Sequence, residues 1–223
     1  MRYERIRAGT FIDRPNRFIA HVRLDGRVET VHVKNTGRCR ELLVPGARVY
    51  LADAGADAAR KTRYDLVAVE KGERLVNMDS QAPNAAVLEW LRAGELFPPG
   101  TEIRPEFKYG DSRFDFGLLT PDLALLEVKG VTLERDGVVL FPDAPTERGA
   151  KHLRELTAFP GAAYVLFVVQ MEGVRYFAPN EATDPAFAAA LRTARNAGVR
   201  ILAYDCRVTP ESMELNEPVE VRL

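Results

Sequence analysis

Residues 113–129 read Arg-Phe-Asp-Phe-Gly-Leu-Leu-Thr-Pro-Asp-Leu-Ala-Leu-Leu-Glu-Val-Lys, two apolar runs joined by a turn that contains Pro121. This pattern predicts a β-hairpin. If the turn centres on Pro121, residues equally distant from it face each other, which places Asp115 opposite Glu127. Side chains alternate along a strand, so Lys129 shares their face of the sheet. The opposite, core-forming face takes the large apolar side chains: Phe114, Phe116, Leu126 and Val128.

Asp115, Glu127 and Lys129 form a candidate catalytic metal site. Two close carboxylates repel each other unless a cation lies between them, and Mg²⁺ prefers oxygen ligands. A bound Mg²⁺ or Mn²⁺ could polarise a phosphodiester and lower the pKa of an attached water molecule. Lys129 would then orient the nucleophile or stabilise developing negative charge. The pattern favours metal-assisted phosphodiester hydrolysis, and the alternative is a surface salt bridge among the same side chains.

A second acid-x-Lys tripeptide, Glu106-Phe107-Lys108, lies on the strand predicted before Asp115. In a chain of this composition, about one such tripeptide is expected by chance. Two interpretations stay open: it belongs to the same site, or it lies on a solvated face.

A helix is predicted at about 146–157, with Thr146 as its N-cap. Arg148, His152 and Glu155 recur on one face of this helix. Beside the hairpin, that face could contact a phosphate or a base, so Arg148, Lys151 and His152 are candidate nucleic-acid contacts. The alternative is the solvent side of an amphipathic helix, and a structural role for His152 is equally compatible with the pattern.

Residues up to about 78 consist of short alternating apolar runs separated by turn signals, which is typical of a β-meander. Asp25-Gly26 predicts a tight hairpin, because glycine adopts positive φ without steric cost. About five such strands suit an OB-like barrel. After Pro83 helices and strands alternate in the order αβββαβαβ, beginning with a helix that Asn84 could cap. We therefore expect two domains, 1–80 and 81–223.

The charge distribution supports a division between these domains. The net charge of the 223 residues is −1, but residues 1–40 carry ten Arg and Lys against four acids. Such a basic N-terminal segment favours binding to a polyanion, although chance asymmetry of a solvated surface explains the counts as well. The expected phosphate contacts are Arg14, Arg17, Lys34 and Arg38. Possible base-stacking platforms are Phe11, Phe18 and Tyr50, although most such aromatic residues belong to a core.

Other features exclude several classes of protein. The apolar stretches are too short to span a bilayer and no signal-type region follows Met1, so we expect a cytoplasmic protein without a membrane partner. The cysteines, Cys39 and Cys206, lie far apart and outside any CxxC cluster. We therefore expect packed, reduced thiols and neither a disulfide framework nor a zinc site.

Several segments together resemble the sugar fermentation stimulation protein A family over essentially the full length. The segments are 17–18, 35–37, 45–46, 106–110, 113–116, 126–133, 141–149 and 151–156. The resemblance implies an N-terminal OB-like domain, a C-terminal domain similar to the PD-(D/E)xK nucleases, non-specific DNA binding and an ascribed regulatory role in sugar metabolism. Phe114 departs from the proline that precedes the first acid in the wider nuclease pattern. In related nucleases a helix before the strands often supplies a further acid, which implies Glu89 as a third metal ligand.

The expectation is therefore an α+β chain with an N-terminal OB-like β-barrel followed by a PD-(D/E)xK nuclease-like α/β domain. Its expected function is non-specific nucleic-acid binding with a Mg²⁺-dependent or Mn²⁺-dependent nuclease site. One rival is a non-catalytic DNA-binding regulator of sugar (maltose) metabolism that retains the nuclease fold, and another is a small-molecule enzyme or scaffold. Expected partners are DNA, single-stranded DNA or RNA, with a homodimer as an option. The sequence does not decide among these nucleic acids.

Overall fold

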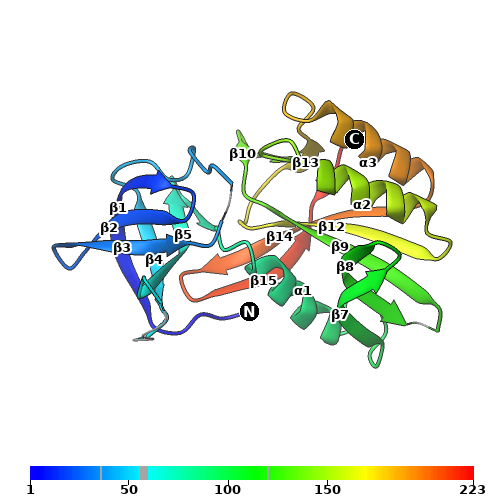
Figure 1. Cartoon of the computed structure of the whole chain (residues 1–223), viewed down its shortest axis with the longest axis horizontal. Helices are drawn as coiled ribbons and strands as arrows, with labels where there is room; N and C mark the ends of the chain where they lie inside the picture. The colour runs from blue at the N-terminus through cyan, green and yellow to red at the C-terminus, as the bar shows by residue number, and fades with distance from the viewer. Residues whose placement is uncertain (36, 56–59, 120) are drawn as a thin grey trace.

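The computed structural model describes residues 1–35, 37–55, 60–119 and 121–223. Thr36, in the segment 35–37, and Thr120, in the turn of the predicted hairpin, lie outside the described residues. A β-barrel formed by the N-terminal residues lies beside a sheet with helices on both faces (Figure 1). The expected fold class, an OB-like barrel followed by a mixed α/β domain, is confirmed.

The barrel is closed by a pairing between its third and fifth strands. Its strand order is β3-β2-β1-β4-β5-β6, and the additional pairing of β3 with β5 closes five strands into a barrel. At the predicted β2–β3 hairpin, Asp25 and Gly26 have φ values of 50° and 78°. These positive values match the primed turn expected there. The strands are β1 (Ile6–Asn16), β2 (Ile19–Leu24), β3 (Arg27–Val33), β4 (Arg48–Asp53), β5 (Tyr64–Lys71) and β6 (Arg74–Asn77).

The C-terminal domain is built on a second sheet, with the order β15-β14-β12-β9-β8-β7. Strands β9, β12 and β14 are parallel, while β7, β8 and β15 run antiparallel to their neighbours. The elements are α1 (Ala82–Arg92), β7 (Glu102–Tyr109), β8 (Ser112–Leu119), β9 (Leu123–Val131), α2 (Glu147–Ala158), β12 (Ala162–Val169), α3 (Pro185–Asn196), β14 (Arg200–Thr209) and β15 (Ser212–Pro218). The predicted order of helices and strands is present, with β15 as an addition at the edge.

A small third sheet was not predicted. It has the order β10-β11-β13-β16, and each strand has only two to four residues. Such short strands carry little periodic signal in the sequence. The strands are β10 (Glu134–Arg135), β11 (Val138–Phe141), β13 (Tyr176–Pro179) and β16 (Glu220–Val221).

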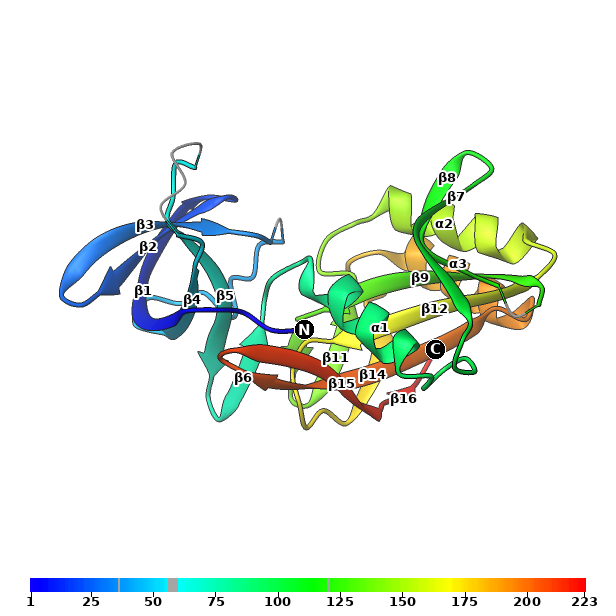
Figure 2. The ribbon, with the colours of Figure 1, turned by 90° about the horizontal axis from the view of Figure 1, so that it is seen from below.

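Helices cover the main sheet on both faces (Figures 1 and 2). Buried residues of α1, such as Val87 and Leu91, pack with Phe116 and Leu126 of the sheet. On the other face, Leu153 of α2 and residues of α3 pack in the cluster that includes Val165 and Phe167. The candidate hairpin β8–β9 therefore lies inside a three-layer arrangement.

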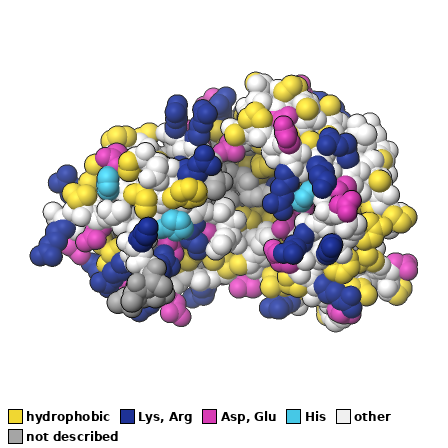
Figure 3. All heavy atoms as spheres, viewed as in Figure 1, with side chains coloured by type: hydrophobic (Ala, Val, Ile, Leu, Met, Phe, Trp, Pro, Cys, Tyr) yellow, Lys and Arg dark blue, Asp and Glu magenta, His cyan; other side chains and the backbone are white. Residues whose placement is uncertain are grey.

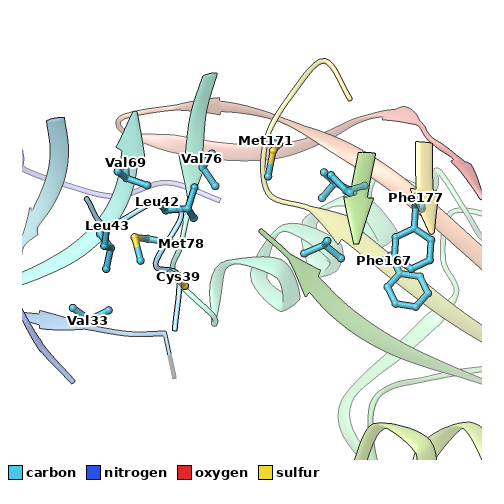
Figure 4. Packing of buried hydrophobic residues seen from close by; sticks show 14 of the residues in the cluster. Val33, Cys39, Leu42, Leu43, Val69, Val76, Met78, Phe167, Met171 and Phe177 are labelled. Carbon is cyan, nitrogen blue, oxygen red and sulfur yellow. The ribbon is translucent and has the colours of Figure 1, made fainter. Parts of the chain in front are cut away.

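Buried contacts also join the two domains. The cluster that contains Phe167 and Phe177 continues to Met78 and Leu42 on the barrel side (Figure 4). Gln170 Nε2, which is buried at this junction, donates to Asn77 O at 3.1 Å, to Asn77 Oδ1 at 3.0 Å and to Asp79 O at 3.1 Å. Apolar packing and hydrogen bonds therefore fix the barrel against the sheet.

Helix termini differ in part from the prediction. Thr146 caps α2 as expected, since its Oγ1 accepts a hydrogen bond from Gly149 N at 3.0 Å. The prediction that Asn84 caps α1 is wrong, because α1 begins at Ala82 after Gln81, and Asn84 lies within its first turn. Its side chain is thereby free for a different contact, described below.

Two absences were expected from the sequence. No helix among the described residues is long and apolar enough to cross a membrane. Cys39 and Cys206 are buried and unbonded to each other. Burial raises the pKa of the Cys39 thiol to about 12 and raises the pKa of Cys206 as well, so both remain protonated at neutral pH.

Candidate metal centre and nucleic-acid surface

The β8–β9 hairpin has the register expected from a turn centred on Pro121. Leu119 pairs with Leu123, and the ladder continues to Phe116 opposite Leu126. Beyond Phe116 the strands separate, and the side chain of Asp115 replaces backbone pairing as the contact between β8 and β9. Its Oδ2 accepts a hydrogen bond from the backbone N–H of Val128 at 2.7 Å. Asp115 is therefore held directly against β9 at Val128, the residue that follows Glu127.

The separation of the strands changes the face on which Phe114 packs. The prediction that Phe114 shares a face with Phe116 is wrong: Phe116 packs under α1, whereas Phe114 packs on the side of α2. The physical reason is a bend of the β7–β8 hairpin, which rises from the sheet toward α2 (Figure 2). The centroid of the Phe114 ring lies 5.4 Å from that of the His152 imidazole.

Glu127 is the buried centre of the site, with 4% of its surface exposed. Its Oε1 accepts hydrogen bonds from Lys129 Nζ at 2.5 Å and from His152 Nδ1 at 2.6 Å. Its Oε2 is buried and has no hydrogen-bond partner among the described residues. Burial alone would raise the pKa of Glu127, but His152 and Lys129 outweigh it and hold the pKa below its ordinary value. Glu127 is therefore ionised at neutral pH.

Asp115 has a different electrostatic environment. Its Oδ1 accepts a hydrogen bond from Asn84 Nδ2 at 2.7 Å, which is the contact that α1 contributes. Burial and the negative charge of Glu127 raise the pKa of Asp115, although the hydrogen bonds and Lys129 act in the opposite direction. The two carboxylates thus repel each other, and a nearby cation would relieve the repulsion.

The donor set suits a hard divalent cation. Asp115 and Glu127 provide carboxylate oxygens, and the unpartnered Glu127 Oε2 is a buried acceptor for which the described residues offer no donor. Water and a substrate phosphate could complete the ligands, as is common for Mg²⁺. In the part of the chain that the structure describes, no group of three or more His, Cys, Asp or Glu residues gathers closely enough to hold a metal ion. Two protein carboxylates are therefore the available ligands.

Glu89, the third ligand implied by the family resemblance, lies elsewhere. Its exposed carboxylate pairs with the amino group of Met1 at 2.6 Å, and that group also donates to Met213 O on β15. Strand β15 forms one edge of the main sheet, whereas β8 lies close to the other edge. The structure therefore does not bring Glu89 to Asp115 and Glu127.

The three predicted contacts on α2 separate into two kinds. Arg148 and Lys151 are exposed, and Lys151 lies 3.6 Å from the carboxylate of Glu155. His152 is buried against Glu127 and Phe114 instead of lying on the exposed face. Helical spacing cannot reveal this difference, because the bent hairpin that covers His152 comes from a distant part of the chain.

The four predicted phosphate contacts on the barrel also divide into side chains that bind other parts of the protein and side chains that are exposed. Arg14 donates to backbone carbonyls of residues 17, 35, 37 and 38, so its guanidinium organises two loops. Lys34 Nζ pairs with the buried Asp79 at 2.9 Å. Arg17 and Arg38 are exposed and line a groove of about 570 Å³ together with Arg40. The groove therefore offers exposed guanidinium groups that Arg14 and its loops support.

The remaining candidates from the sequence are the three possible base-stacking aromatic residues and the second acid-x-Lys tripeptide. Phe11 is buried, the Tyr50 hydroxyl donates to Glu70 at 2.7 Å, and Phe18 is 51% exposed beside Arg17. Phe18 alone among these three aromatic residues offers an open ring. Glu106 is exposed and pairs with Arg113 at 3.0 Å, so the second acid-x-Lys tripeptide lies on a solvated face.

Basic side chains gather on both domains on one face of the molecule. Figure 3 shows Lys and Arg side chains on the barrel and on the helical side of the C-terminal domain. The groove that contains Arg17 and Arg38 is also lined by Ala144, which lies just before α2. It therefore opens toward the helix that carries Arg148 and Lys151.

Comparisons with known proteins agree with this architecture. A family model described as the sugar fermentation stimulation protein RE domain matches residues 81–212. A second family model, described as the SfsA N-terminal OB domain, matches residues 12–78. A sugar fermentation stimulation protein homolog of Desulfitobacterium hafniense (strain Y51) is 54% identical, with alignment of 100% of this chain and 99% of the relative. A homolog of Ruminiclostridium cellulolyticum is 52% identical over the full length of both chains.

A solved structure shares the whole fold. It is that of Pyrococcus furiosus SfsA in complex with Ca²⁺, with a TM-score of 0.85 and 27% sequence identity, and the match covers 100% of this chain and 98% of that chain. With both family domains matched and full-length relatives at about half identity, the chain belongs to the sugar fermentation stimulation protein (SfsA) family.

Proposed function

We propose that this protein binds nucleic acid through its basic face and hydrolyses phosphodiesters at Asp115, Glu127 and Lys129 with a bound divalent cation, Mg²⁺ or Mn²⁺. The observation that carries the proposal is the buried Oε2 of Glu127, which has no hydrogen-bond partner among the described residues, beside a second carboxylate whose pKa is raised. The P. furiosus relative, whose structure is described as a complex with Ca²⁺, gives further support. Ca²⁺ and Mg²⁺ are both hard cations that select oxygen ligands.

Each residue of the site would have a distinct role. Asp115 and Glu127 would hold the cation, which when bound supplies Lewis acidity toward a phosphoryl oxygen and acidifies a water molecule. Lys129 is within hydrogen-bond reach of Glu127 and could donate to a phosphate oxygen as negative charge develops there. Asn84 and the Val128 amide keep Asp115 in place through their hydrogen bonds.

The path of the nucleic acid follows from the exposed cations. Arg17, Arg38 and Arg40 line the barrel groove, and Arg148 and Lys151 project from α2. Phosphate contacts by such side chains position a strand without reading its sequence. The exposed Phe18 ring beside Arg17 could stack on an unpaired base. These features favour a ligand with at least one single-stranded segment.

A second candidate function is nucleic-acid binding without cleavage, as in a regulator. One observation favours it: Glu89, the third acid implied by the family pattern, pairs with the amino group of Met1 and lies away from Asp115. On this alternative, the carboxylate pair would bind a cation for stability and the basic face would act alone.

A cleavage assay tests the proposal. Labelled single-stranded DNA, duplex DNA and RNA are each incubated with the protein and Mg²⁺ or Mn²⁺, and wild type is compared with Asp115→Asn. We expect cleavage of at least one substrate, a loss of about 10²–10³-fold in the variant, and no cleavage in EDTA. Asp122→Asn is the matched control, because Asp122 is exposed in the turn of the same hairpin. Undiminished cleavage by Asp115→Asn would refute the site, and binding without any cleavage would support the second candidate.

A further inference from the structure

His152 contacts the candidate metal site from a separate element. It lies on α2, is 4% exposed, and its Nδ1 is 2.6 Å from Glu127 Oε1. Because an ionised carboxylate can only accept hydrogen bonds, Nδ1 carries the proton and donates it. The imidazole is thus a fixed donor aimed at a proposed metal ligand.

The contact limits the orientation of the Glu127 carboxylate. Lys129, two residues after Glu127 on the same strand β9, donates to the same Oε1 at 2.5 Å. Both donors contact one oxygen, and the other oxygen, Oε2, has no hydrogen-bond partner in the part of the chain that the structure describes. A glutamate side chain has several accessible rotamers, so two donors from different elements hold it in one of them.

His152 also contacts the strand that carries Asp115. The Phe114 ring packs on the imidazole at a centroid distance of 5.4 Å, and Phe114 directly precedes Asp115. Helix α2 itself is anchored by the Thr146 cap and by Leu153 and Leu156, which are buried in the core. One side chain therefore contacts both strands of the site where they separate.

We propose that His152 is a positioning residue that orients Glu127 so that its second oxygen, Oε2, faces the divalent cation. The inference rests on the proposed metal site and assigns to His152 a role other than contact with nucleic acid. Groups that orient a metal ligand by hydrogen bonding typically contribute 10–100-fold to metal affinity. The hydrogen bond, more than the bulk of the ring, carries this role.

Two substitutions separate the hydrogen bond from the packing. His152→Phe keeps an aromatic ring against Phe114 and removes the donor, whereas His152→Asn keeps an N–H donor near the position of Nδ1 and removes the ring. Mn²⁺ binding to the full chain is measured by isothermal titration calorimetry, and thermal unfolding in EDTA reports whether each variant is folded. A second donor-free variant, His152→Leu, repeats the test with a smaller side chain.

We expect His152→Phe and His152→Leu to weaken Mn²⁺ binding about 10–100-fold and His152→Asn to remain within about threefold of wild type. Wild-type affinity in both donor-free variants would overturn the inference. So would weak binding by His152→Asn together with normal binding by His152→Phe, which would indicate packing alone. If wild type binds no Mn²⁺, or Asp115→Asn binds it as tightly as wild type, the proposed metal site itself fails. Loss in Asp115→Asn without loss in the donor-free variants refutes only the role of His152.

Discussion

Substitution of Lys129 by methionine tests the electrostatics of the site most directly, because it removes the ammonium group and keeps a similar chain length. Lys129 Nζ lies 2.5 Å from Glu127 Oε1, and the two side chains are 17% and 5% exposed. Removing one partner of a buried pair costs about 3–5 kcal/mol. His152 still donates to the same oxygen, so we expect a lower cost of about 2–3 kcal/mol in the free energy of unfolding.

Thermal unfolding in EDTA measures this cost. For a chain of this size, 1 kcal/mol shifts the Tm by about 2–4 °C, so the Tm of Lys129→Met should fall by about 4–12 °C. Saturating Mn²⁺ should then raise the Tm of the variant by more than it raises that of wild type. The reason is that the cation replaces the positive charge that the substitution removed from the carboxylate pair.

Lys108→Met is the matched control for this prediction. Lys108 belongs to the second acid-x-Lys tripeptide and is exposed, so its loss should change the free energy of unfolding by less than about 0.5 kcal/mol. Two results would refute the reasoning. An unchanged Tm for Lys129→Met in EDTA would mean that the ion pair does not stabilise the fold, and equal stabilisation of variant and wild type by Mn²⁺ would mean that the ammonium and the cation do not share these carboxylates.

Three further predictions concern pH, salt and the domain junction. The raised pKa of Asp115 favours its protonated form in the folded state, so its contribution to metal-free stability should decline as the pH rises from about 4 through the raised pKa. Urea unfolding in EDTA should show that decline in wild type and not in Asp115→Asn. Glu127 should behave in the opposite way, because its pKa is lowered: its contribution to the free energy of unfolding should be lost as the pH falls through its pKa in the folded state. Replacing Arg38 and Arg40 by Gln should reduce the slope of log K against log salt for a single-stranded oligonucleotide by about 1.4, with an unchanged slope as the contrary result. Gln170→Leu leaves acceptors of the junction unsatisfied and should cost about 1–3 kcal/mol, measured as a lower urea midpoint at unchanged m-value.

Local patterns account for the parts of the fold that the sequence predicts. Two apolar runs joined by a turn centred on Pro121 are sufficient for the β8–β9 register, because the centre of the turn decides which residues face each other. Asp25-Gly26 similarly fixes the β2–β3 turn through its backbone preferences. The three charged residues Asp115, Glu127 and Lys129 are placed close together by these same short-range rules.

The surroundings of that cluster depend on segments distant in sequence. His152 has an ordinary position on an amphipathic helix, and only the bent β7–β8 hairpin buries it against Glu127. Asn84 resembles a helix cap, yet its amide reaches across to Asp115. Arg14 resembles a phosphate contact, yet its donors are taken by backbone carbonyls of two loops. The hydrogen-bond partners of these three side chains depend on how distant elements pack together, and such packing produces no periodic pattern in the sequence.

The sequence alone therefore predicts an OB-like barrel, the αβββαβαβ order of the main elements after it, and a carboxylate pair with a lysine on one hairpin, because apolar patterns and turn chemistry are local properties of the chain. The tertiary structure was needed to show which oxygen of Glu127 has no hydrogen-bond partner among the described residues, on which side of the sheet Phe114 packs and where Glu89 lies. The physical reason is that burial and hydrogen bonding at Glu127 arise from α2 and β9 together, and the position of α2 on the sheet follows from packing across the whole domain.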